Sequence, residues 1–257
     1  MAIWPFLLVA LLSLVCEYIA ATLGGGYGTL LVPALFLLGF NLPEVVPAVL
    51  LSQLLTGIIA ALAHHKLGNV NLRPSSRSFR LAFVLGASGS LGVLVAMFGQ
   101  LSLPRLAVET YVALMILVMG IFLLTGLKMK ALNSSFSWGK ITCIGLLASF
   151  NKGIGGGGYG PLLVGGQVLS GVAEKEAVGI TVLSEAITCL VGFLGYILIL
   201  KAFSWDLALA VTLGAVISAP LSAYSVRRAN PRFLRFGMGL LITASGSAML
   251  LKIAVGL

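Results

Sequence analysis

Residues 24–28 read GGGYG and are followed by TLLVPALFLLG, and residues 156–160 read GGGYG again, followed by PLLVGGQVLSG. Glycine is the poorest helix former after proline, so a cluster of four glycines weakens any helix that contains it. The same cluster appears twice between apolar stretches, which indicates that the backbone has to be open at both places. The two GGGYG segments therefore predict two helix breaks.

The composition is typical of a membrane protein. Of the 257 residues, 59% are hydrophobic and only 9% are charged, whereas a soluble domain carries about 25% charged residues. Apolar runs of about twenty residues follow one another, and the alternation expected of β-barrel strands is absent. We therefore predict an all-α integral membrane protein that forms a single transmembrane domain over residues 1–257.

The charges and cysteines exclude several other classes of function. The net charge is +9, but most Lys and Arg residues lie in short loops, as cytoplasmic loops of membrane proteins require, so no nucleic-acid partner is expected. Cys16, Cys143 and Cys189 lie in apolar segments without metal-ligand spacing. We therefore expect no metal site, no disulfide and no cofactor.

The chain also repeats itself after 132 residues, because positions 24–56 align without a gap with positions 156–188. Identical pairs downstream of GGGYG include Leu30 with Leu162, Gly39 with Gly171, Glu44 with Glu176, Ser52 with Ser184 and Thr56 with Thr188. Chance matches in apolar sequence do not keep such an order. The repeat predicts two homologous halves, residues 1–130 and 131–257.

Basic loops orient the predicted helices. Lys and Arg cluster in the loops near 64–80, 128–140 and 227–235, and all three loops should face the cytoplasm. This holds only if the chain turns back at each GGGYG segment without crossing the membrane. Each half is then a glycine-broken helical hairpin followed by three transmembrane helices, and the odd number of crossings makes the two halves an inverted repeat. Both termini would be extracytoplasmic.

The breaks also suggest a binding site. A helix that starts inside the membrane presents free N–H groups and a partial positive charge. Two such N-termini, near Tyr27 and Tyr159, would face each other and bind a small anion. The alternative is that the glycines only let helices pack closely.

Polar residues inside the predicted helices extend this site. Ser52 and Gln53 occupy positions equivalent to Ser184 and Glu185 near the middle of a span, where interhelical hydrogen bonding is the alternative role. The predicted substrate-binding residues are Gly24, Gly25, Gly26, Tyr27, Gly28, Ser52, Gln53, Asn151, Lys152, Gly156, Gly157, Gly158, Tyr159, Gly160 and Ser184.

Ionisable residues inside a membrane are costly and therefore informative. Lys152 directly precedes the second break, where the first half has Ala20, and it is the predicted cation beside an anionic substrate. Glu185 or Glu17 would carry a coupling proton, with sodium as the other coupling ion considered. The alternative is a structural ion pair between Lys152 and one of these glutamates.

The two glycine-rich breaks, LLVPALFLLG at 30–39, HHKLGNVN at 64–71 and the two-half layout resemble the TauE/SafE family of membrane permeases. The resemblance covers nearly the whole chain. It implies a secondary transporter in the plasma membrane that moves sulfite or a small organosulfonate. The family's usual break reads G-x-G-G-G, whereas Tyr27 and Tyr159 stand here in place of a glycine and add bulk and a hydroxyl group.

Two other functions fit parts of the sequence. GASG at 86–89 matches the GxSG pattern of intramembrane proteases, with Ser88 as nucleophile, but the only histidines are His64 and His65 in a basic loop. Such an enzyme needs a base on another span, so this function is disfavoured. A passive anion channel is the second alternative, and alternating access is favoured over it by the inverted repeat around broken helices.

Overall fold

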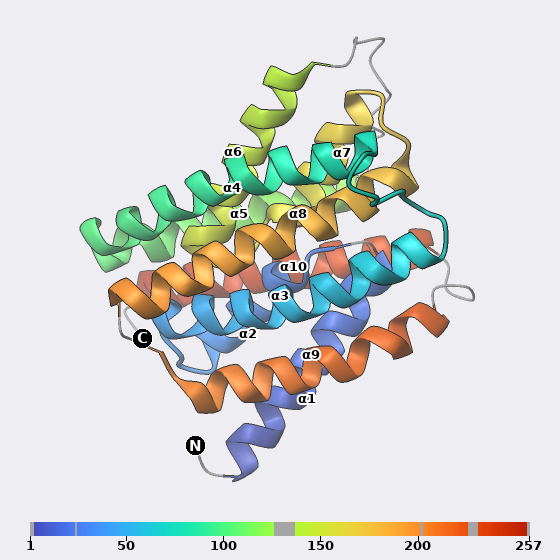
Figure 1. Cartoon of the computed structure of the whole chain (residues 1–257). Coiled ribbons are helices and arrows are strands. Elements are labelled where there is room, and N and C mark those ends of the chain that lie inside the picture. The colour runs from blue at the N-terminus through green and yellow to red at the C-terminus, as the bar shows by residue number, and fades with distance from the viewer. Residues whose placement is uncertain (1–2, 24, 126–136, 201–202, 226–230, 256–257) are drawn as a thin grey trace.

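The computed structural model describes residues 3–23, 25–125, 137–200, 203–225 and 231–255, and these form a bundle of helices (Figure 1). The helices are α1 (Ile3–Leu23), α2 (Tyr27–Leu37), α3 (Leu42–Lys66), α4 (Arg77–Ser102), α5 (Arg105–Thr125), α6 (Trp138–Gly155), α7 (Tyr159–Leu169), α8 (Glu174–Gly195), α9 (Trp205–Ser225) and α10 (Pro231–Val255). A short π-helix, Tyr196–Leu200, continues α8. Six of the described helices are long and apolar enough to cross a membrane, which confirms the prediction of an all-α membrane protein.

Both predicted helix breaks are present. At the first, Gly25 and Gly26 have φ angles of +136° and +109°, and at the second, Gly156 and Gly158 have φ angles of +66° and +80°. Glycine adopts this half of the φ range without steric cost, which explains its use here. The helices that follow, α2 and α7, have 11 residues each. At 1.5 Å per residue they are about 16 Å long, roughly half the hydrocarbon core of a bilayer.

The two breaks cross each other in direct backbone contact. A Cβ atom added to Gly28 would overlap the carbonyl oxygen of Gly156, and one added to Gly157 would lie 2.9 Å from the backbone nitrogen of Thr29. The Gly158 N–H donates a hydrogen bond of 3.0 Å to Thr29 Oγ1. Segments 132 residues apart in the repeat are therefore packed together with no room for side chains between them.

The chain reverses direction at the second break. Helices α4, α6 and α8 run in the same direction. Earlier residues of α4 face earlier residues of α6 and α8, and later residues of α4 face later residues of both. The pairs that fix these directions are Leu85 with Gly145, Val93 with Gly153, Gly86 with Ile187 and Val93 with Gly192. Since α6 and α8 are parallel, α7 between them has to bring the chain back.

The equivalent helices α3 and α8 run in opposite directions (Figure 1). Leu50 of α3 faces Gly192 of α8, and Gly57 of α3 faces Ala186 of α8. The residue numbers rise along α3 while they fall along α8, so the two helices are antiparallel. The first helix of each half also packs against a helix of the other half: α1 packs against α9, and α6 packs against α4. The first turns of α1 and of α6 project from opposite sides of the bundle (Figure 1).

The crossing predicts that one added methyl group is harmful. Gly28→Ala should lower the free energy of unfolding by about 1–3 kcal/mol or more, because the new Cβ meets backbone that cannot move aside. Gly99→Ala is the matched control, since an added Cβ at Gly99 in α4 meets nothing within 4 Å. Thermal unfolding of both variants in detergent measures the difference. Equal melting temperatures would show that the breaks do not touch.

Candidate functional site

A cavity of about 100 Å³ lies where the two breaks meet. Gly25 and Gly26 of the first break and Gly160 at the start of α7 line its inner end. It continues between the second half of α3 and the first half of α8, and it reaches His64 in the last turn of α3. The cavity therefore extends from the crossing towards the end of the bundle that carries the 67–76 loop.

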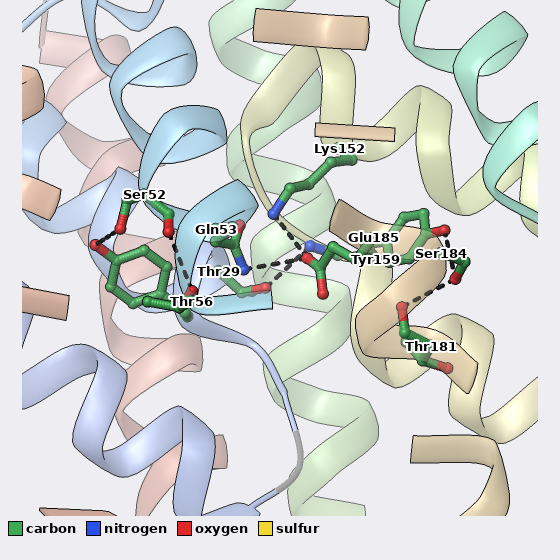
Figure 2. A network of polar contacts seen from close by, with 11 residues as sticks. Thr29, Ser52, Gln53, Thr56, Lys152, Tyr159, Thr181, Ser184 and Glu185 are labelled. Atoms are coloured by element: carbon green, nitrogen blue, oxygen red, sulfur yellow. Dashed lines mark hydrogen bonds and ion pairs between the residues drawn. The ribbon is translucent and has the colours of Figure 1, made fainter. Parts of the chain in front are cut away.

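Glu185 of α8 is the centre of the polar network beside this cavity (Figure 2). Its Oε1 atom accepts a hydrogen bond of 2.9 Å from Lys152 Nζ and one of 3.1 Å from Gln53 Nε2. Glu185 and Gln53 occupy equivalent positions of the repeat, so the two halves meet at this contact. Both residues line the cavity.

Lys152 lies behind Glu185 and is not among the residues that line the cavity. Its side chain is 1% exposed, against 12% for Glu185. The sequence left two roles open for Lys152, a contact with an anionic substrate and an ion pair with a glutamate. The ion pair is present, and the partner of Lys152 is Glu185. Burying two charges is tolerated because each neutralises the other and Gln53 adds a further hydrogen bond.

The tyrosines of the GGGYG segments fix the short helices to their neighbours. The Tyr27 hydroxyl is 2.7 Å from Ser13 Oγ and 3.2 Å from Ser52 Oγ. Tyr159 donates a hydrogen bond of 3.0 Å to Ser184 Oγ. Each tyrosine is 1% exposed, and its hydroxyl is used within the protein. In both halves this bond ties the first turn of the short helix to the following long helix.

Glu17 is the second carboxylate at the cavity. It lies in α1, is 9% exposed and lines the cavity with Ala20. Among the described residues, no hydrogen bond or ion pair reaches the Glu17 carboxylate. Its equivalent in the second half is Ser149, so this acid is present on one side of the repeat only.

The structure divides the predicted site residues into three groups. Those that line the cavity are Gly25, Gly26, Tyr27, Gln53, Gly160, Glu17 and Glu185. Those buried behind it or at the crossing are Gly28, Ser52, Asn151, Lys152, Gly156, Gly157, Gly158, Tyr159 and Ser184. Gly24 lies outside the described residues. Asn151 accepts a hydrogen bond from the Tyr111 hydroxyl, which the sequence did not predict.

Sequence reasoning missed several residues of this region. Thr56, Thr181 and His64 line the cavity. Thr56 carried a signal, since it lies one turn after Ser52 and recurs in the repeat. Thr29 accepts the hydrogen bond from the Gly158 N–H at the second break. No signal in the sequence pointed to Thr29, because its counterpart in the repeat is Pro161.

The contacts of Ser88 do not support a protease. Ser88 Oγ donates a hydrogen bond of 3.2 Å to the Leu85 carbonyl within its own helix. His65 Nδ1 contacts the Val70 carbonyl and the Leu72 N–H at 3.3 Å each. No hydrogen bond joins Ser88 to a histidine in the part of the chain that the structure describes.

The ion pair predicts opposite effects for single and double variants. Lys152→Gln should lower the free energy of unfolding by about 3–5 kcal/mol, because it leaves the Glu185 carboxylate buried without a cation. Adding Glu185→Gln should restore most of the loss. Arg105→Gln is the control, since in the Arg105–Glu109 pair the cation is 70% exposed and only the carboxylate is buried, at 12% exposure. The loss there should be smaller, about 1 kcal/mol. Melting temperatures in detergent test this, and a double variant no more stable than the single one would contradict it.

The chain is similar in sequence to known membrane transporters. The family described as Sulfite exporter TauE/SafE matches residues 9–249. The probable membrane transporter protein YtnM of Bacillus subtilis (strain 168) is 24% identical over 240 residues, which are 88% of this chain and 76% of that protein. No solved structure matches the chain. Because the family match covers nearly the whole chain, the prediction of a transporter rather than an enzyme is confirmed: the protein belongs to the TauE/SafE sulfite exporter family of membrane transporters.

Proposed function

We propose that the protein is a secondary transporter of a small anion, a sulfur oxyanion or organosulfonate such as sulfite, in the plasma membrane. The anion binds at the inner end of the cavity, and the protein works by alternating access. The observation that carries the proposal is the crossing of two helix N-termini at the end of a cavity that also holds two carboxylates. The description of the matching family as sulfite exporters gives the substrate class.

The backbone at the crossing suits an anion. The first turn of a helix has N–H groups without a partner in that helix and carries a partial positive charge. Gly25, Gly26 and Tyr27 bring the start of α2 to the cavity, and Gly160 brings the start of α7. The absence of side chains at the glycines lets an anion approach the backbone. A cavity of about 100 Å³ has room for several water-sized groups, and therefore for an anion of a few heavy atoms.

The directions of the helices support an inverted repeat. Equivalent helices α3 and α8 are antiparallel, and α7 returns between the parallel helices α6 and α8. Each break is then the tip of a hairpin, and the second half is inverted relative to the first. With cytoplasmic loops at 64–80, 128–140 and 227–235, both termini are extracytoplasmic. The predicted basic residues Lys128, Lys130, Arg227 and Arg228 lie outside the described residues.

The counterpart of the cavity in the second half is closed, which supports alternating access. Positions equivalent to the cavity residues Ala20, Gly57 and His64 hold the larger Lys152, Cys189 and Tyr196. All three of these are buried. The Tyr196 hydroxyl lies 2.7 Å from the Gly153 carbonyl oxygen and 2.6 Å from Gln100 Oε1. One pathway is therefore open while its equivalent is filled.

The closed side is nevertheless polar. Ser149 Oγ is buried there without a hydrogen-bond partner among the described residues, and Ser149 is the equivalent of the cavity residue Glu17. Buried hydroxyl groups usually find partners. A hydroxyl that is unpaired in this conformation fits a pathway that fills with water when the other side closes.

Counterflow in proteoliposomes tests the function. Vesicles loaded with unlabelled sulfite should transiently accumulate labelled sulfite when they contain the protein. Ala20→Met should reduce this uptake at least tenfold, because it puts a long side chain where the closed half has Lys152. Ala107→Met is the control, since Ala107 is an exposed residue of α5.

A passive anion channel gives a different result in the same experiment. If the membrane potential is clamped near zero with potassium and valinomycin, a channel lets labelled sulfite equilibrate without transient accumulation, because inward and outward movements are not linked. Uptake without an overshoot would therefore contradict the transporter and support the channel. No sulfite-dependent signal, or full activity of Ala20→Met, would contradict the site.

A further inference from the structure

We propose that Glu17 is a proton-binding site, and that one proton enters the cavity with each anion and leaves with it. This inference rests on the proposed anion transport, and it names the coupling ion. It is carried by the placement of the two cavity carboxylates, only one of which has a cation.

Glu185 cannot bind the coupled proton without losing its ion pair with Lys152. Its Oε1 atom is bonded to Lys152 Nζ at 2.9 Å and to Gln53 Nε2 at 3.1 Å. A proton on Glu185 would leave the Lys152 ammonium buried without an anion, which is unfavourable. Glu185 and Lys152 therefore contribute no net charge to the cavity.

Among the residues that the structure describes, none pairs with Glu17 in this way. The polar side chains from neighbouring helices that line the cavity with Glu17 are Tyr27 of α2, Gln53, Thr56 and His64 of α3, and Thr181 and Glu185 of α8. Lys152 of α6 also acts on Glu17 electrostatically. Of these, Lys152 is committed to Glu185, and His64 lies at the far end of the cavity. On α9 and α10, the described ionisable groups Asp206 and Lys252 do not line the cavity. An ionised Glu17 would therefore make the cavity negative.

An anion in this cavity requires Glu17 to be neutral. Glu17 lines the same cavity as Gly25 and Gly26, where the anion is proposed to bind, so its charge acts on an anion held there. Like charges repel strongly where little water separates them. When a proton from water binds a Glu17 carboxylate oxygen, the repulsion disappears and the new O–H group can donate a hydrogen bond to the anion. The reverse transfer accompanies release on the other side.

Calorimetry can count this proton. The probe is methanesulfonate, whose charge stays constant between pH 5 and pH 9, so any proton taken up binds to the protein. Titrations of the purified protein in two buffers of different ionisation enthalpy give the number of protons taken up per anion bound. We expect about one at the alkaline end of this range, with affinity falling up to tenfold per pH unit. In Glu17→Gln, which resembles the protonated acid, the proton uptake should be zero and the affinity independent of pH.

Glu109→Gln is the matched control. Glu109 is also 9% exposed, but it pairs with Arg105 at 2.6 Å and does not line the cavity, so this variant should take up protons as the wild type does. Binding without proton uptake by the wild type would overturn the inference, whether or not the Glu17 variant folds. Persistent uptake by Glu17→Gln, or affinity that follows sodium instead of pH, would also overturn it. If the protein binds neither methanesulfonate nor sulfite, the proposed anion transport itself is contradicted.

Discussion

The backbone contact between the two glycine breaks is the constraint on which the rest of the structure depends. Gly28 and Gly156 approach too closely for any side chain, so the start of α2 has to lie on the segment that precedes α7. This contact holds both short helices inside the bundle. It also leaves their first turns, with unpaired N–H groups, beside the cavity. A tyrosine hydroxyl in each half then fixes the first turn to the next long helix.

The electrostatics follow from the same arrangement. The antiparallel crossing of α3 and α8 brings the equivalent residues Gln53 and Glu185 into contact. Lys152, immediately before the second break, is then close enough to neutralise Glu185. Lys152 is thus paired within the protein, and in the proposed site the attraction for an anion comes from backbone groups. Under this proposal the site binds and releases an anion without breaking a buried ion pair.

Much of the fold could be predicted because its main signals are local and repeated. Glycine clusters mark the breaks, apolar runs mark the helices, and a constant offset of 132 residues relates Gln53 to Glu185. The sequence could not choose between Glu17 and Glu185 as the partner of Lys152, because that choice depends on how α1, α6 and α8 are placed in the folded protein. It also predicted the GGGYG tyrosines as substrate-binding residues, and it could not show that their hydroxyls contact Ser52 and Ser184, because a residue type does not reveal its partner.

The central claim is that an anion binds where the two helix N-termini cross. Anomalous diffraction from crystals soaked in selenite, a heavier analogue of sulfite, tests it most directly. We predict a selenium peak at the inner end of the cavity, placed so that the selenite oxygens accept hydrogen bonds from the backbone N–H groups of Gly26 or Tyr27. A peak beside Lys152 and away from the cavity, or peaks confined to the basic loops, would contradict this assignment.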